Sequence, residues 1–231
     1  AGKRYQPDPA GTHHSLSTVS HSPRFHIHSK CGHVHKSGVL YQKKKSDTAS
    51  SQDSSRLTLA AMKSCNISAS LAQWAKEMPD QAAIIEMRSK TQTTFKQLEE
   101  ESSLIASGLL HHGMKKGGRV LVMVPYGTAF VTLTFALFKA GAVPILIDPG
   151  LGKKNVLHCI KQSQPKGIIA VPLAHAIKTL MPSAFKSIQL SVTVGKRWFW
   201  LGPTLNQIKG SGQTDYQMSD TTEDQEAAVL F

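Results

Sequence analysis

The chain has 231 residues and a formal net charge of +12, and 40% of its residues are hydrophobic. This length and apolar content allow one large domain or two small ones with a real core. Its three cysteines, Cys31, Cys65 and Cys159, are too few and too irregularly spaced for a disulfide framework, which excludes the disulfide-stapled secreted classes and favours a reducing compartment.

Residues 1–56 differ from the rest of the chain in charge and composition. They hold nine Lys/Arg and three Asp/Glu, so about a quarter of the chain carries half of the net charge. Ser, His, Lys and Gly dominate, and such a segment cannot bury enough apolar surface to fold. We therefore expect a disordered basic tail over residues 1–56 and a folded domain over residues 57–231. A solvated tail explains the charge without a specific nucleic-acid partner.

The same tail contains a cluster of potential metal ligands, His26, His28, Cys31, His33 and His35. Imidazole and thiolate groups at this spacing bind zinc or copper weakly, but no second pair of cysteines completes a tetrahedral site. We expect an opportunistic His-rich segment and no resident metal. No apolar signal-peptide core is visible, and the basic, Ser-rich composition only overlaps that of organelle transit peptides. The expected location is the cytoplasm, with organelle targeting left open.

Order is expected to begin near Leu57, and hydrophobic periodicity then predicts alternating helices and strands. A Thr94/Gln97 capping box marks the start of a long helix. The expected elements, in chain order, are a helix at 68–75, strands at 82–87 and 91–94, a helix from 94, a strand at 119–124, a helix at 130–140, a strand up to 148, a helix at 155–163, a strand at 167–171, a helix at 174–180 and strands at 188–194 and 227–231.

Strands that alternate with helices of this length are typical of right-handed βαβ units. The predicted fold class is therefore α/β, a mostly parallel sheet with flanking helices. The nineteen residues Ala129–Ile147 carry a single charge, Lys139, but Gly141 and Pro144 divide them, so we expect a buried helix and a buried strand and no membrane span. In such sheets, ligands bind at the carboxyl ends of the strands.

Several familiar sites are not supported by the motifs. No Gly-x-Gly-x-x-Gly or Gly-Lys-Ser/Thr phosphate loop follows the strand that ends at Val124. His111 and His112 are expected at the end of a helix, where cationic side chains suit the helix dipole. His158 and His175 are not accompanied by a recognisable set of Ser or Cys nucleophile and acid, as a catalytic triad would require. The run Lys196–Trp200 is more typical of aromatic packing than of base stacking. Asp148 ends a buried strand, where a site residue and a cap of the Asp-Pro-Gly turn are equally good interpretations.

Two motifs resemble those of the adenylate-forming superfamily of acyl-CoA synthetases, adenylation domains and luciferases. Thr94-Phe95-Lys96-Gln97-Leu98 resembles its Thr-Tyr-x-Glu-Leu motif, with Phe95 and Gln97 as mild departures. Leu137–Pro149 resembles its Leu-x-Lys-Ala-Gly motif, apolar strand and Asp-Pro. Ala227–Phe231 looks like the strand that precedes its phosphate loop. Ile147–Gly152 and Val192–Trp200 look most like the β-lactone synthetases of olefin biosynthesis, often labelled fatty-acid CoA ligases.

The resemblance implies that a fatty or β-hydroxy fatty acid attacks the α-phosphate of ATP, after which coenzyme A or the β-hydroxyl of the substrate displaces AMP. Such an enzyme would use ATP, Mg²⁺ and, where it is the acceptor, coenzyme A, and this part by itself is expected to bind none of them well. The remainder of the ligase domain would be its partner. The family's phosphate loop and catalytic groups match no residue here, so no catalytic, cofactor-binding or metal-binding residue is assigned.

Three hypotheses follow from the sequence. The first is the front part of an ATP-dependent ligase, inactive by itself. The second is a non-catalytic fragment of the same fold that needs a partner chain, because an unpaired last strand would invite aggregation. The third is a basic nucleic-acid binder led by the tail, whose salt-sensitive binding would be lost with residues 1–56.

Overall fold

A computed structural model of the chain describes residues 25–26, 65–87 and 89–231. The expected disorder of the tail and the His-rich cluster fall almost wholly outside these residues and stay predictions. The described part contains strands β1 (Phe25–His26), β2 (Ala82–Glu86), β3 (Thr91–Thr94), β4 (Arg119–Met123), β5 (Val143–Leu146), β6 (Gly167–Ala170), β7 (Leu190–Thr193) and β8 (Val229–Leu230). Its helices are α2 (Ser68–Glu77), α3 (Phe95–His111), α4 (Thr128–Lys139), α5 (Lys153–Ser163), α6 (Pro172–Leu180) and α7 (Leu205–Gly210), with short 3-10 turns η1 (Pro149–Leu151) and η2 (Pro182–Ala184).

A six-stranded sheet, in the order β1-β8-β5-β4-β6-β7, forms the centre of the molecule. Its last five strands pair in parallel, and β1 pairs antiparallel with β8. The predicted α/β class is confirmed. Phe25 and His26 thus pair with β8, the last strand, for which the second hypothesis required a partner chain. A separate hairpin joins β2 and β3.

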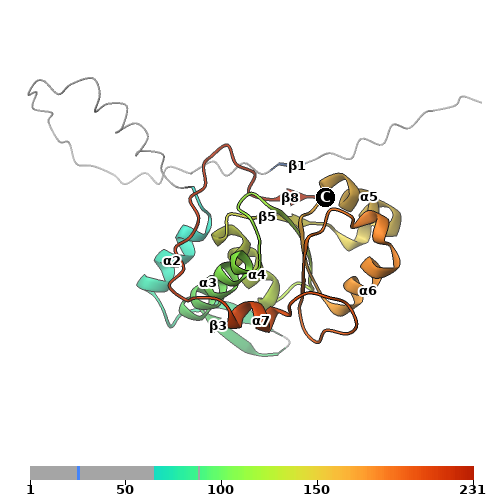
Figure 1. Ribbon diagram of the computed structural model, residues 1–231. Coiled ribbons are helices and arrows are strands. Elements are labelled where there is room, and N and C mark those ends of the chain that lie inside the picture. Colours follow the sequence, from blue (N-terminus) through green and yellow to red (C-terminus); the bar gives the residue numbers. More distant parts are fainter. Residues whose placement is uncertain (1–24, 27–64, 88) are drawn as a thin grey trace, which may run out of the picture.

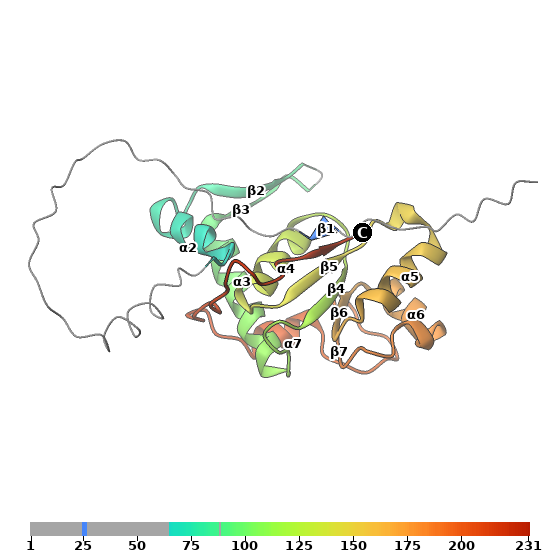
Figure 2. The ribbon, with the colours of Figure 1, turned by 90° about the horizontal axis from the view of Figure 1, so that it is seen from above.

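Helices cover both faces of the sheet, as Figure 2 shows most clearly. On one face, α3, α4 and α7 pack on side chains that include Val120, Val122 and Val192. On the other, α5 and α6 pack on Leu121 and Ile145 among others. Alternate residues of β4 therefore pack into the cores on opposite faces of the sheet, which explains the continuous apolar run in this strand.

The local signals in the sequence have clear structural counterparts. The Thr94 hydroxyl accepts from the Gln97 N–H at 3.2 Å while the Gln97 side chain accepts from the Thr94 N–H at 2.9 Å, so the capping box is confirmed. The run Ala129–Ile147 is α4 followed by β5. Within the described ranges, we find no helix that is long and apolar enough to cross a bilayer.

Candidate functional site

The carboxyl edge of the parallel sheet is the place where the topology gathers the loops that would form a site. The Asp-Pro-Gly turn follows β5, and the chain leaves β8 immediately beside it. The Phe231 N–H donates to the Leu146 carbonyl at 3.1 Å, and the Asp148 N–H donates to the Phe231 carbonyl at 3.1 Å. Figure 2 shows this end of the chain next to β5 and the start of α5. Whatever follows Phe231 would therefore begin at this edge.

Asp148 acts as a cap within its own turn. Its Oδ1 accepts from the Gly150 N–H at 2.8 Å, and η1 begins at the next residue, Pro149. Of the two interpretations of the sequence, the turn cap is the one for which the geometry shows a contact. The carboxylate is exposed to solvent. Four residues further on, Gly152 has a φ of 79° and is the residue from which the chain enters α5.

The β2–β3 hairpin brings a second carboxylate to the same edge, beside the loop between β4 and α4. α4 has no cap from its own N-cap residue, Gly127. The Glu86 carboxylate, from the β2–β3 hairpin, accepts a hydrogen bond from the Thr128 backbone, and the hydroxyl of Ser89 donates to it at 2.7 Å. These hydrogen bonds, led by that from Ser89, lower the pKa of Glu86. A carboxylate at this position also suits the positive end of the α4 dipole.

His175 and Trp200 lie together under the loop that follows β7. His175 is fully buried on α6, its Nε2 lies 3.0 Å from the Val192 carbonyl, and its ring stacks on Trp200 at 5.3 Å. Trp200 donates from Nε1 to the Thr193 hydroxyl at 2.8 Å. Burial lowers the pKa of His175, so the ring is neutral at physiological pH. The packing interpretation of the aromatic run is correct for Trp200, while Trp198 is exposed.

The remaining histidines and the cysteine of the described helices lie in surroundings that do not resemble an active site. His112 places its Nδ1 2.9 Å from the Gly108 carbonyl at the end of α3. His158 is exposed on α5. Burial raises the pKa of the Cys159 thiol, which keeps it protonated and unreactive. Among the described residues, no group of three or more His, Cys, Asp or Glu side chains is placed to hold a metal ion.

Lys139, the lysine of the second motif, lies away from the carboxyl edge at the other end of α4. Its side chain is 1% exposed, and its Nζ lies 2.7 Å from the Glu99 carboxylate and donates to the Ser103 hydroxyl at 2.7 Å. It also donates to the Glu99 carbonyl at 2.9 Å. The lysine therefore ties α4 to α3, and among residues 65–87 and 89–231 none of its side-chain contacts reaches the carboxyl edge.

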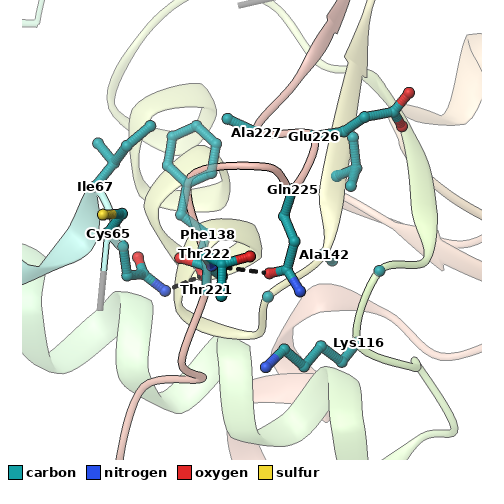
Figure 3. Close-up of a pocket in the computed structure, with 14 residues that line it drawn as sticks. Cys65, Ile67, Lys116, Phe138, Ala142, Thr221, Thr222, Gln225, Glu226 and Ala227 are labelled. Atoms are coloured by element: carbon teal, nitrogen blue, oxygen red, sulfur yellow. Dashed lines mark hydrogen bonds between the residues drawn. The ribbon is translucent and has the colours of Figure 1, made fainter. Parts of the chain in front are cut away.

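A pocket of about 370 Å³ opens at the amino edge of the sheet, opposite the carboxyl edge (Figure 3). The segment before β8 crosses over it, and its polar groups pair with one another. The Asn66 amide donates to the Ser219 carbonyl at 2.9 Å, the Lys116 ammonium to the Asp220 carbonyl, and the Thr222 N–H to the Gln225 side chain at 3.3 Å. The pocket is the space left where this segment packs across the sheet.

The described residues do not fit ATP or Mg²⁺ as a complete site. The carboxylates that reach the carboxyl edge, Asp148 and Glu86, are engaged by backbone N–H groups, and the loop after β4 carries a single glycine, Gly127. The expectation that no catalytic residue can be assigned here stays a prediction.

Two features of this part of the chain were not predicted from the sequence. Helix α7 was missed, although Thr204 and Gln207 form the same kind of capping box that identified α3. The bidentate pair of Arg119 with Glu226, at 2.7 to 3.0 Å, joins β4 to the segment before β8, and no local pattern signals a contact across 107 positions.

Comparison with known proteins decides the family. The family model described as "AMP-binding enzyme" matches residues 71–231, most of the chain. The chain belongs to the AMP-binding enzyme family. This confirms the resemblance inferred from the two motifs.

Among curated members of this family, an olefin β-lactone synthetase of Xanthomonas campestris is 41% identical over 177 residues, which cover 72% of this chain and 32% of that protein. A second olefin β-lactone synthetase, from Stenotrophomonas maltophilia, is 38% identical over 178 residues, which again cover 72% of this chain and 32% of that protein. The chain therefore spans about a third of the length of these relatives. A crystal structure of a long-chain-fatty-acid–CoA ligase from Archaeoglobus fulgidus, 19% identical, superposes with a TM-score of 0.65 over 73% of this chain and 34% of that one. It supports the fold.

Proposed function

We propose that this chain serves as the first α/β unit of an AMP-forming acid ligase that activates a fatty acid, with a β-hydroxy fatty acid as its substrate. The 41% identity to an olefin β-lactone synthetase is the observation that carries the proposal. The reaction class is acyl-adenylate formation with release of pyrophosphate, followed by displacement of AMP by the β-hydroxyl. Coenzyme A as acceptor is the alternative that the CoA ligases among its relatives favour. The compartment we propose is the cytoplasm.

Within that ligase, we assign the chain a scaffolding role. The paired ends of β5 and β8 set the place and direction in which a following phosphate loop would leave the sheet. The capped turn at Asp148 and the capped start of α4 hold the two neighbouring loops in place. Preorganised loops are what a site for phosphoryl chemistry needs from its scaffold, because charge stabilisation depends on fixed donors.

A chimera tests this proposal directly. Residues 65–231 would replace the matching third of the Xanthomonas campestris relative, and ATP–pyrophosphate exchange would be measured with a β-hydroxy fatty acid, a simple fatty acid and no acid. We expect exchange that depends on the acid, and a β-lactone product from the β-hydroxy acid. The unmodified relative and the separate 231-residue chain are the controls.

A folded chimera without acid-dependent exchange would overturn the proposal. If the chimera does not fold, the same replacement is made in the Stenotrophomonas maltophilia relative. Failure of both chimeras to fold would likewise show that the chain does not supply the first unit of these enzymes. Exchange without any β-lactone, but with thioester formation on addition of coenzyme A, would replace the β-hydroxyl by coenzyme A as acceptor.

A further inference from the structure

Helix α6 presents an apolar stripe to the outside of the molecule. Leu173, Ile177 and Leu180 follow the i, i+4, i+7 spacing of one helical face, and Leu180 is 81% exposed. The opposite face carries Ala174 and His175, which are buried against the sheet. An amphipathic helix normally turns its apolar stripe to the core, but α6 is apolar on both sides. Its outer stripe therefore lacks a partner within the described residues.

The loop after β7 extends this apolar surface with aromatic side chains. Trp198 is exposed, Phe199 is 70% exposed and Leu201 is 90% exposed. Trp200, buried beneath them, contacts the rings of Trp198 and Phe199 with centroids 5.5 and 5.2 Å away. Its stacking on His175 fixes the loop against α6. Both views show the segment after β7 beside α6 (Figures 1 and 2).

The chain segment that contains this surface carries charge of one sign. Residues 149–214, which include α5, α6 and the loop after β7, hold nine Lys/Arg and no Asp/Glu. Lys186, Lys196 and Arg197 are exposed; Lys196 and Arg197 directly precede Trp198 in the chain, and Lys186 lies between α6 and β7. Lys178, on α6, is held by the Ser191 hydroxyl at 2.6 Å. The acidic residues of the described chain lie in the segments before and after this one.

We propose that α6 and the loop after β7 form a docking surface for an anionic lipid membrane. We define this lipid-facing surface by Leu173, Ile177, Leu180, Trp198, Phe199 and Leu201 with the cations Lys186, Lys196 and Arg197. Trp, Phe and Leu side chains partition into the headgroup–acyl boundary, and neighbouring Lys and Arg are attracted to anionic lipids. The uniform positive charge favours this occupant over a second copy of the same cationic surface, which would repel it.

Lipid docking is tested by co-sedimentation of the 231-residue chain with phosphatidylcholine vesicles that do or do not contain 30 mol% phosphatidylglycerol, a composition chosen as about one third anionic. We expect binding to the anionic vesicles, weakening as salt rises, and little binding to the neutral ones. Tryptophan emission should shift to shorter wavelength on binding, and Trp198→Phe should remove most of that shift. The assay contains neither ATP nor fatty acid, so its failure is separate from failure of the proposed function.

Matched variants locate the binding surface and guard against a contribution from the basic tail. Phe199→Ser with Leu180→Ser, and separately Lys196→Glu with Arg197→Glu, should each weaken binding at least tenfold. The control pair Met87→Ser and Lys96→Glu changes an exposed apolar residue and an exposed cation elsewhere and should leave binding unchanged. Thermal unfolding of every variant verifies folding.

Three results would overturn the proposal. Undiminished binding by both sets of variants would assign lipid binding to another part of the chain. A dimer that these substitutions dissociate, without vesicle binding, would assign the surface to a second copy. Loss of vesicle binding in the ligase chimera, with the surface residues intact, would show that later segments of the ligase cover it.

Discussion

A buried lysine joins the two helices that cover one face of the sheet. Burial lowers the pKa of Lys139, and its hydrogen bond to the Glu99 carboxylate acts in the opposite direction. Because the ammonium also donates to the Ser103 hydroxyl, each of its three N–H groups has an acceptor. The side-chain contacts of the lysine in the family motif are thus contacts between packed helices.

Lys139→Met is expected to lower the free energy of unfolding by about 2–4 kcal/mol, because it leaves a partly buried Glu99 carboxylate without its cation. Urea denaturation measures the change. The double variant Lys139→Met/Glu99→Leu should recover most of the loss, since both charges are then absent. Lys96→Met, at an exposed position of the same helix α3, is the control. A stability equal to that of the unmodified chain would contradict the packing role.

His175 makes stability depend on pH in a defined direction. Its pKa in the folded chain is lowered, first by burial and then by the charge of Lys178, while the Val192 carbonyl acts against these effects. The unfolded chain therefore binds more protons below about pH 6.5, the ordinary value for histidine. Stability contributed by the neutral ring is present above that pH and is lost as the pH falls below it.

His175→Gln keeps a donor for the Val192 carbonyl and removes the titration. The drop in urea midpoint between pH 7.5 and pH 5 should be smaller in this variant than in the unmodified chain. His158→Gln, on the exposed surface of α5, should keep the full drop. An equal pH dependence in all three proteins would show that His175 is not the group responsible.

At the scale of elements, an ion pair fastens the last strand. Two of the three nitrogens of the Arg119 guanidinium donate to the Glu226 carboxylate, so the start of β4 anchors the segment that leads into β8. The pair is about one third exposed, which screens it, but its bidentate geometry adds directionality.

Glu226→Gln should cost about 0.5–1.5 kcal/mol in unfolding free energy and accelerate hydrogen exchange at the Phe231 N–H, which pairs β8 with β5. Glu101→Gln is a matched control, because Glu101 and Lys209 form a pair of similar exposure between α3 and α7. It should lower stability comparably without faster exchange at Phe231. Faster exchange at Phe231 in both variants would contradict a local anchoring role.

The close contact of α3 with α7 reverses an ordinary rule for helical glycine. Alanine normally stabilises a helix interior by up to about 1 kcal/mol relative to glycine. At Gly108, however, an added Cβ would lie 2.0 Å from the Ile208 carbonyl oxygen, so the backbones would have to separate.

Gly108→Ala should therefore destabilise the chain by about 1–3 kcal/mol, as overpacking does. Differential scanning calorimetry or urea unfolding would show the sign. Gly210→Ala, where an added Cβ meets nothing within 4 Å, should be neutral or stabilising. Stabilisation by Gly108→Ala would mean that α7 is held less closely than described.

Local signals predicted most elements, and contacts between distant residues account for what was missed. The alternation of apolar runs located β4 to β7, and the Thr94/Gln97 box located α3, because these signals lie within one turn or one strand. The partners of Lys139 and Arg119 lie 40 and 107 positions away in sequence, so periodicity could not identify them. The role of Asp148 was undecided because a turn cap and a site residue share the same sequence.

For the whole molecule, charge is distributed along the chain in blocks. Residues 149–214 have nine cations and no acidic residue, whereas residues 215–231 have five acidic residues and no Lys or Arg. The acidic block crosses the amino edge, where the Glu226 carboxylate pairs with Arg119 and the Asp220 backbone carbonyl accepts from Lys116. Opposite charges thus assist the return of the chain to the sheet, and the cationic block is left at the face that we assign to lipid.

The 231-residue chain by itself is expected to show no fatty-acid-dependent ATP–pyrophosphate exchange. Acceleration of this reaction depends on fixed groups that stabilise charge at the phosphorus. The described part of the chain presents no metal-binding cluster, and its carboxyl-edge carboxylates serve as caps. Exchange is measured with labelled pyrophosphate over a range of acid chain lengths, with the chimera as positive control. Acid-dependent exchange by the chain alone would contradict the scaffolding role and would require phosphate-binding groups among residues 1–231.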